Sequence, residues 1–286
     1  MRITIFGATG LLGKSLMQEW AGDEVTGLGS SDADIRDAQQ VFATIQRTRA
    51  EWIVLAAAYT DVDGCEQNRD LAFEVNCRGA VNVAQAAKAA NARLLFVSTD
   101  YIFDGTKTTP YEAGDPRTPR SVYGHSKAQA EIALTQILPD CCIARTSWLF
   151  GMGGRCFPDT ILKLAADRKE IEVVNDQRGS PTYAVDLARA IVQLCRSQAE
   201  GIVHVTNQGE CTWFEFAREL LARAGLATIV RPVTSDKFVR PAERPKYSVL
   251  LPASLERYGI VLPQWQDALQ RYLEARKSNR PQTIPS

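Results

Sequence analysis

A glycine-rich turn at the start of the chain is the feature that most constrains the fold. An apolar run at residues 2–6 leads into Gly7, Gly10 and Gly13, spaced as G-x-x-G-x-x-G. Gly7 permits a tight turn, Gly10 lets the backbone approach a pyrophosphate, and Gly13 allows the next helix to pack closely. Phosphates then bind free amide groups at the helix N-terminus. The motif predicts a dinucleotide site, against the alternative of a plain strand–turn–helix junction. The intervening positions are Thr9, Leu11 and Leu12.

Strand-like and helix-like patterns alternate through the first 150 residues. We expect strands at 2–6, 25–28, 52–58, 93–98 and 141–146, and helices at 11–20, 39–48, 71–90 and 126–138. Alternation at this spacing predicts β-α-β units and a parallel sheet covered on both faces. The expected fold class is therefore α/β, with a Rossmann-type doubly wound parallel sheet.

The pattern changes after Gly151, where strand-like segments become short. They fall at 171–174, 229–233 and 247–250, beside a strand at 202–206 and helices at 185–195 and 212–224, the last capped by Thr212. We expect a dinucleotide-binding domain at 1–150, to which a segment of about 183–210 returns. Residues 151–286 are then mainly a smaller C-terminal substrate-binding lobe.

Composition excludes several classes of partner. Lys+Arg and Asp+Glu balance at 33 each, which argues against binding to nucleic acid or an anionic membrane. No apolar run is long enough for a transmembrane helix, and the N-terminus does not resemble a signal peptide. Seven cysteines without a Cys-x-x-Cys pair indicate free thiols in a reducing cytoplasm. We assign no metal ligand.

The region after the second strand bears on the choice of nicotinamide cofactor. An NAD-specific fold places a carboxylate there, but Gly27–Ser31 contains none before Asp32. It also contains no arginine for a 2′-phosphate, unless Arg2 or Lys14 reaches that point. We therefore expect NADPH, with NADH as the alternative.

Two further segments are candidates for cofactor contact. Asp34 and Ile35 either contact the adenine or form a solvated turn. Ala56, Ala57 and Ala58 follow a strand, and their small side chains either let the backbone lie against the cofactor or simply pack within the sheet.

Tyr123 and Lys127 lie four residues apart, so they share one face of a helix. We expect the ammonium to lower the tyrosine pKa and so prepare it for proton transfer. A nicotinamide supplies hydride but no proton, which makes such a donor suitable for carbonyl reduction. A tyrosine and a lysine at this spacing are common by chance. The pair indicates a catalytic site here because the glycine motif precedes it. Ser98 and Thr99 end a predicted strand, where a hydroxyl can bond a substrate carbonyl.

This Ser/Thr–Tyr–Lys triad, with the glycine motif, resembles the extended short-chain dehydrogenase/reductase superfamily. Longer blocks are similar to those of the dTDP-4-dehydrorhamnose reductase family: Thr60–Asp63, Ser98–Phe103, Tyr123–Lys127, Arg145–Gly151 and Asp176–Thr182. The resemblance implies an oxidoreductase of dTDP-rhamnose biosynthesis. Such an enzyme reduces the C4 ketone of dTDP-6-deoxy-L-lyxo-4-hexulose with NAD(P)H, takes a nucleotide-diphosphate sugar as substrate, and is compatible with a homodimer.

The resemblance also implies roles for individual residues. Thr99 polarises the C4 carbonyl, Tyr123 protonates the alkoxide, and Lys127 binds the nicotinamide ribose and tunes Tyr123. The expected substrate contacts are Asp100, Tyr101, Trp148 and Arg244. A core position remains the alternative for Trp148, and a surface salt bridge the alternative for Arg244. The chain departs from the family at Cys156-Phe157, where Asn-Phe is usual, and at Tyr247, where Asn is common.

Two other functions fit the same scaffold. A nucleotide-sugar epimerase or 4,6-dehydratase with tightly bound NAD requires an acid–base carboxylate pair, whereas Thr99-Asp100-Tyr101 offers one carboxylate. A non-catalytic NADP-binding regulatory subunit is the third hypothesis, because a fold alone does not fix function.

Overall fold

The computed structural model describes residues 1–20 and 22–278. Within them, six parallel strands form the main sheet in the order β10-β5-β4-β3-β1-β2. The strands are β1 (Arg2–Phe6), β2 (Glu24–Leu28), β3 (Trp52–Leu55), β4 (Arg93–Thr99), β5 (Cys142–Thr146) and β10 (Gly201–His204). The chain runs outward from β1 first to one side and then to the other, which is the Rossmann-type arrangement. The predicted fold class is therefore confirmed.

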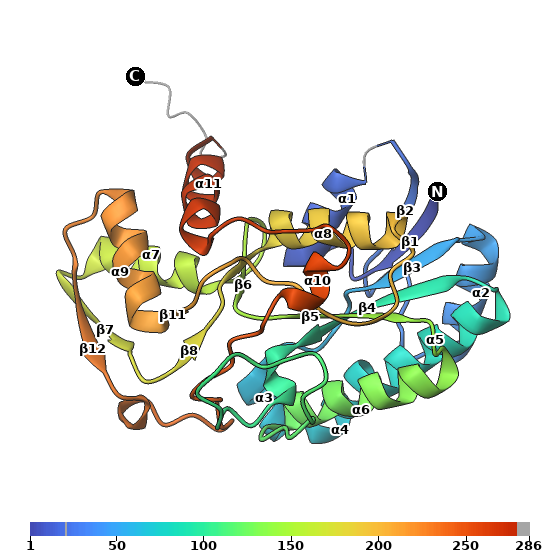
Figure 1. Ribbon diagram of the computed structural model, residues 1–286, viewed down its shortest axis with the longest axis horizontal. Helices are drawn as coiled ribbons and strands as arrows, with labels where there is room; N and C mark the ends of the chain where they lie inside the picture. Colours follow the sequence, from blue (N-terminus) through green and yellow to red (C-terminus); the bar gives the residue numbers. More distant parts are fainter. Residues whose placement is uncertain (21, 279–286) are drawn as a thin grey trace.

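Helices cover both faces of this sheet (Figure 1). One face carries α1 (Leu11–Glu19) and α8 (Ala184–Arg196), and the other carries α2 (Ala38–Thr48), α5 (Gly79–Ala89) and α6 (Val122–Ile137). Every residue of β3 is buried, because a parallel strand covered on both faces reads as one continuous apolar run. The short helix α10 (Ala253–Glu256) packs against β10.

The expected helix at 71–90 contains an irregular turn. It consists of α4 (Arg69–Phe73), a π-helical turn (Glu74–Arg78) and α5. The π turn carries the buried Asn76, which accepts from the Tyr59 amide at 2.7 Å and donates to Ser126 Oγ at 3.0 Å. The extra residue of the π-helical turn therefore places the Asn76 side-chain amide between the segment after β3 and helix α6. A further helix, α3 (Val62–Gln67), precedes α4 and was not predicted.

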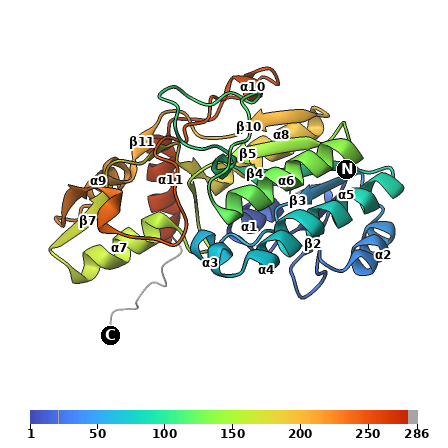
Figure 2. The ribbon, with the colours of Figure 1, turned by 90° about the horizontal axis from the view of Figure 1, so that it is seen from below.

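A second, smaller lobe lies beside the carboxyl edge of the sheet (Figure 2). Its helices are α7 (Phe157–Asp167), α9 (Trp213–Ala224) and α11 (Trp265–Ser278), and its strands are β6 (Leu149–Phe150), β7 (Glu170–Val174), β8 (Arg178–Gly179), β9 (Thr182–Tyr183), β11 (Cys211–Thr212) and β12 (Ile229–Val233). Two 3-10 turns occupy Asp100–Ile102 and Ser235–Lys237. Aromatic rings from four elements pack together at the centre of the lobe: Phe150, Tyr183, Phe216 and Tyr272.

Several local predictions can be compared directly. The Thr212 cap is confirmed, because Thr212 Oγ1 accepts from Glu215 N at 3.1 Å and Glu215 returns a bond to Thr212 N. A strand at 247–250 is wrong, since this segment makes only isolated bridges, such as Tyr111 with Leu250. The strand expected at 52–58 is shorter than predicted. β3 ends at Leu55, because the chain leaves the sheet after the Ala56 amide donates to the Phe6 carbonyl.

The described residues contain no helix that combines the length and apolar character needed to cross a bilayer. They also contain no group of three or more His, Cys, Asp or Glu side chains arranged to hold a metal ion.

Candidate active site

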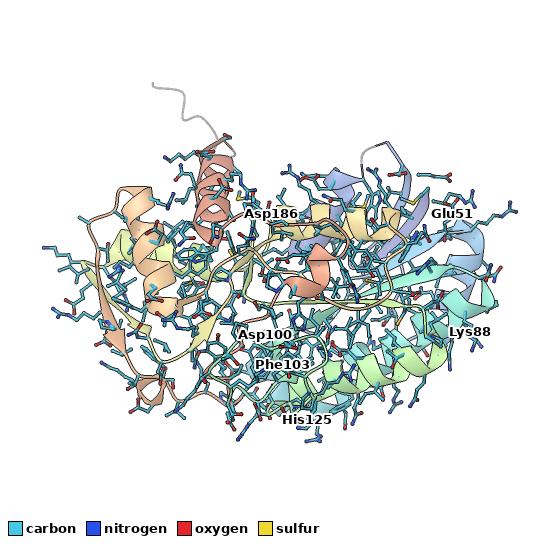
Figure 3. The ribbon with its side chains drawn as sticks, viewed as in Figure 1. Glu51, Lys88, Asp100, Phe103, His125 and Asp186 are labelled. Carbon is cyan, nitrogen blue, oxygen red and sulfur yellow. The ribbon has the colours of Figure 1, made fainter. Side chains whose placement is uncertain are left out.

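A cavity of about 370 Å³ lies at the carboxyl ends of β1, β3, β4 and β5. In Figure 3 the labelled Asp100, which lines this cavity, lies near the middle of the molecule. The cavity brings together most of the predicted site residues: Gly7, Gly10, Leu11, Leu12, Gly13, Ala56, Ala58, Thr99, Asp100, Tyr101, Tyr123, Lys127 and Trp148. Residues from both halves of the chain therefore meet at one place.

The three positions of the glycine turn differ in whether a side chain would fit there. Gly7 has φ +90°, and a Cβ there would lie 2.6 Å from Ala57 N. A Cβ on Gly13 would lie 2.1 Å from the carbonyl oxygen of Gly7. A Cβ on Gly10 would meet its nearest protein atom only at 3.4 Å, which is ordinary contact. The protein backbone itself thus requires Gly7 and Gly13, whereas Gly10 leaves open space next to the first turn of α1.

Four predicted cofactor residues are not among those that line this cavity. Ala57 lies directly against Gly7, and the exposed Thr9 lies over Gly29. Ile35 is buried against Gly79, while Asp34 forms an ion pair with Arg36. The partly exposed Asp34 is in keeping with a solvated turn, whereas the buried Ile35 is not. Cofactor contact by these residues stays a prediction.

Arg2 cannot reach the ribose end of the site. Its Nε donates to the Arg49 carbonyl at 2.8 Å, and its guanidinium pairs with Glu51. Figure 3 labels Glu51 at the far end of the sheet from Asp100. The reason is topological, because Arg2 begins β1 and the cavity lies where β1 ends. Lys14 lies nearer, and its Nζ donates to the Gly153 carbonyl at 2.7 Å.

Tyr123 lies in the first turn of α6, which begins four residues earlier than predicted. Ser121 caps this helix by accepting from Gly124 N at 3.1 Å. Lys127 lies one turn further and is buried, with Nζ donating to the Val97 carbonyl at 2.8 Å and resting 3.8 Å from the Phe96 ring centroid. The helix thus directs both side chains into the cavity.

The expected lowering of the tyrosine pKa is wrong in direction. Burial raises the pKa of Tyr123 above its ordinary value. Burial also lowers the pKa of Lys127 to about 7, although the Glu131 carboxylate opposes this change. Desolvation disfavours both charged forms and is the largest cause of each change. A tyrosine with a raised pKa keeps its proton at neutral pH, which suits a proton donor.

Thr99, Asp100 and Tyr101 form the wall opposite the glycine turn. Thr99 Oγ1 donates to Asp100 Oδ1 at 3.1 Å. The Tyr101 ring meets the Tyr123 ring edge to face, with centroids 5.7 Å apart. Burial raises the pKa of Asp100 to about 6, while hydrogen bonds from Ser248 and Thr99 oppose that rise.

The raised pKa of Asp100 predicts a pH-dependent stability. Because the native state holds this proton more tightly than the unfolded state, the stabilising contribution is full below about pH 4 and is lost as pH rises through about 6. We expect Asp100→Asn to increase the free energy of unfolding by roughly 1–3 kcal/mol at pH 8. The difference should disappear at pH values below about 4. Urea unfolding of both proteins across this range measures it, and a constant difference would contradict the assignment.

A buried charge cluster that sequence reasoning missed lies behind the triad. Glu131 is fully buried and accepts from Ser98 Oγ at 2.6 Å, Arg145 Nη2 at 2.7 Å and Arg117 Nε at 2.6 Å. Burial alone would raise the Glu131 pKa, but Arg145 and the other donors hold it below its usual range. Glu131 thereby fixes Ser98, the neighbour of Thr99. The available signal was its position four residues after Lys127 on the same helix face.

Trp148 lies between the catalytic cavity and the lobe. Its backbone has φ +46°, a left-handed conformation that is uncommon outside glycine. Its ring stacks on Trp213 with centroids 3.4 Å apart and planes 5° apart. On the other side it covers Gly179, where a Cβ would lie 2.4 Å from the Trp148 ring. Trp148 is thus a fixed aromatic wall of the cavity, and its partner Trp213 was not predicted.

A second cavity, of about 600 Å³, lies in the lobe and shares Tyr101 with the first. Phe157 and Trp213 form part of its apolar wall, and Arg244 lies at its edge. Arg244 makes an ion pair with Asp63 at 2.9 Å, as the salt-bridge alternative expected, but both side chains are largely buried. The two departures from the family pattern lie apart. Cys156, which stands where Asn is usual, is buried with its Sγ near the Gly151 carbonyl, whereas the Tyr247 hydroxyl donates to Glu210.

Comparison with known proteins gives a consistent picture. The family model described as "RmlD substrate binding domain" matches residues 1–278. The chain is 39% identical to "Spore coat polysaccharide biosynthesis protein SpsK" of Bacillus subtilis, over 97% of this chain and 98% of that protein. It is 39% identical to a dTDP-4-dehydrorhamnose reductase of Streptomyces griseus, over 94% and 91% of the two chains. A crystal structure of dTDP-4-dehydrorhamnose reductase from Bacillus anthracis in complex with NADP superposes with a TM-score of 0.93, at 37% identity, over 96% and 99% of the chains.

Proposed function

Because this chain belongs to the dTDP-4-dehydrorhamnose reductase family, we propose that it reduces the C4 ketone of a dTDP-4-keto-6-deoxy-hexose to dTDP-L-rhamnose with NADPH. The observation that carries this proposal is the meeting of Thr99, Tyr123 and Lys127 in the cavity that begins at the glycine turn. A proton donor and a hydroxyl thus lie beside the place where a nicotinamide would bind.

The residues present fit a dinucleotide. Gly10 leaves space beside the first turn of α1, where backbone amides favour phosphate, and Lys14 lies on the same turn. Ala56 and Ala58 expose little side chain to the cavity on the other side. NADPH bound there supplies hydride to the ketone carbon.

The chain supplies the remaining chemistry. Thr99 Oγ1 would donate its one proton to the carbonyl oxygen in place of Asp100 Oδ1 and so favour the negative charge that develops there. Tyr123 gives its phenolic proton to that oxygen as the alkoxide forms. Lys127, held by the Val97 carbonyl, binds the ribose and in its protonated form supplies positive charge beside the resulting phenolate. Asp100 and Tyr101 bind the sugar, and Trp148 lies against its apolar face.

The lobe cavity is proposed to hold the nucleotide of the substrate. Tyr101 lines both this cavity and the catalytic cavity, and the apolar wall of Phe157 and Trp213 suits a flat base. In this proposal the dinucleotide-binding domain comprises residues 1–150 with the returning segment at about 183–210. The rest of 151–286 is mainly the substrate-binding lobe. Buried free thiols suit a reducing compartment, which supports a cytoplasmic location.

The test measures the consumption of NADPH with the 4-keto-6-deoxy sugar prepared enzymatically from dTDP-glucose. The absorbance of the reduced nicotinamide monitors the reaction. We expect turnover with NADPH, slower turnover with NADH, and dTDP-L-rhamnose as the product by NMR. Tightly bound NAD in the purified protein, with no net consumption of NADPH, would favour the epimerase or dehydratase hypothesis. Binding of NADPH without turnover of any ketosugar would favour the regulatory subunit.

A further inference from the structure

We propose that Asp63 is a positioning residue for substrate binding, which acts through Arg244 and Tyr101. This inference rests on the proposed function, because the residues that it orders line the cavities assigned to the nucleotide sugar. Asp63 lies in the first turn of α3, directly after the segment that lines the cofactor side of the site. Its partners all lie in residues 240–244, which belong to the other lobe.

The contacts of Asp63 are numerous and directional. Arg244 Nη1 donates to Oδ1 at 3.1 Å and Arg244 Nη2 donates to Oδ2 at 2.9 Å, which makes a two-pronged pair. The Ala242 amide donates to Oδ1 at 3.2 Å, and Arg240 Nη1 lies 3.4 Å from Oδ2. The side chains of Asp63 and Arg244 are only 22% and 23% exposed, so water screens this pair less than an ordinary surface pair. Hydrogen bonding from Arg244 holds the pKa of Asp63 below its usual value.

The chain of contacts continues from Arg244 into the catalytic cavity. Arg244 and Tyr101 line the lobe cavity together, and the positive charge of Arg244 opposes the rise in the Tyr101 pKa that burial causes. Tyr101 lines both cavities and packs edge to face on Tyr123. Displacement of Arg244 would therefore disturb the cavity wall that it shares with Tyr101.

The segment before Arg244 has other anchors at Ala242, which is buried, and at Ser235, which bonds Asp176, but the residues between these two are exposed. Phe238 is 40% exposed and Val239 is 91% exposed, so apolar burial does not hold them in place. Arg120 and Glu243 form an exposed pair at 3.3 Å, of a kind that contributes little. Asp63 thus supplies the main polar contact between residues 240–244 and the sheet domain. Both terminal nitrogens of Arg244 are bonded to Asp63, so the Asp63 carboxylate already occupies the guanidinium fork that a phosphate would need.

The experiment compares Asp63→Asn with Asp63→Glu and with a matched control, Asp186→Asn. Asp186 also joins the two parts of the chain through a two-pronged pair with an arginine, Arg271, at 2.7 Å, but it lies away from both cavities. For Asp63→Asn we expect KM for the nucleotide sugar to rise about tenfold, because the charged partner of Arg244 is lost. We expect kcat to change less than about threefold and the NADPH Kd less than about twofold.

The effect of combining the Asp63 and Tyr101 substitutions shows whether Asp63 acts through Tyr101 or only holds the two lobes together. Tyr101→Phe should also raise KM, and the Asp63→Asn/Tyr101→Phe double variant should be no worse than the poorer single variant. Asp63→Glu should recover most of the affinity, because it restores the charge. Asp186→Asn should lower the melting temperature and leave KM unchanged. Equal KM values for Asp63→Asn and wild type, or an equal rise in KM for Asp186→Asn, would overturn the proposal.

Two readouts do not depend on turnover. Calorimetric titration with dTDP should show the same tenfold weakening in Asp63→Asn. Hydrogen exchange at the Ala242 amide should accelerate in Asp63→Ala but not in Asp186→Ala, since only Asp63 accepts this bond. If wild type binds dTDP but reduces no ketosugar, the proposed function fails while these readouts still decide the role of Asp63. Unchanged dTDP affinity and unchanged exchange would reject that role even in an active enzyme.

Discussion

Tyr123→Phe is expected to lower kcat/KM by about a hundredfold to ten-thousandfold, the range that one general acid contributes. The substitution removes only the hydroxyl, and the ring keeps its edge-to-face contact with Tyr101. Ser121 still caps α6, so Lys127 keeps its place. The alkoxide that hydride transfer produces would then lack the proton donor proposed for it. Initial rates of NADPH consumption measure the loss.

The matched control is Tyr258→Phe. The Tyr258 hydroxyl bonds Glu200 O at 3.1 Å and lies outside the catalytic cavity, so its loss should change kcat/KM less than about twofold. The NADPH Kd of Tyr123→Phe should stay close to that of wild type. A Tyr123→Phe enzyme that keeps more than a third of its wild-type kcat/KM would show that another group donates the proton.

Gly13→Ala is expected to be the most damaging substitution in the glycine turn. The new Cβ would lie 2.1 Å from the Gly7 carbonyl oxygen and 2.5 Å from Ala8 Cα, both backbone atoms that cannot rotate away. The start of α1 must therefore shift, at a cost of about 3 kcal/mol in the free energy of unfolding. NADPH affinity should fall at least about tenfold, since the same turn presents the phosphate-binding amides. Urea unfolding and a fluorescence titration with NADPH measure both effects.

Gly10→Ala separates folding from binding within the same motif. Its Cβ meets no protein atom closer than 3.4 Å, so stability should change by less than about 1 kcal/mol. NADPH affinity should nevertheless fall at least about tenfold, because the methyl group occupies the space left for the pyrophosphate. Gly114→Ala, with no atom within 4 Å of its Cβ, should change neither quantity. Normal NADPH binding by Gly10→Ala would place the phosphates elsewhere.

Sequence patterns predicted the elements whose signals are local. Strands β1 and β12 begin and end where expected, because an apolar or β-branched run stops at a clear turn. Helix α9 begins at its predicted cap, since Thr212 and Glu215 are three residues apart. Helices α7 and α11 were not predicted. Helix α7 carries Pro158 in its first turn, where proline is tolerated.

What escaped prediction depends on distant partners. Asp63 belongs to a recognised block, but its partner Arg244 lies 181 residues away and no spacing rule joins them. Trp148 and Trp213 likewise come from separate segments. The pKa of Tyr123 was predicted with the wrong sign, because the helix spacing reveals its neighbour Lys127 but not the burial that dominates both groups. The sequence therefore revealed which reactive groups lie near one another along a helix, but not how deeply they are buried or which distant residues contact them.

The order in which the sheet is completed has a consequence for synthesis on the ribosome. β10, the last strand of the sheet, and α8, which covers α1, are made only after most of α7, β7 and β8. Until then Leu12 and Leu16 of α1 lack Leu187 and Ile191, with which they share a core in the native state. The nascent N-terminal half therefore emerges with an uncovered apolar face, a condition that favours aggregation and chaperone capture. Expression of residues 1–150 alone would make this transient state permanent.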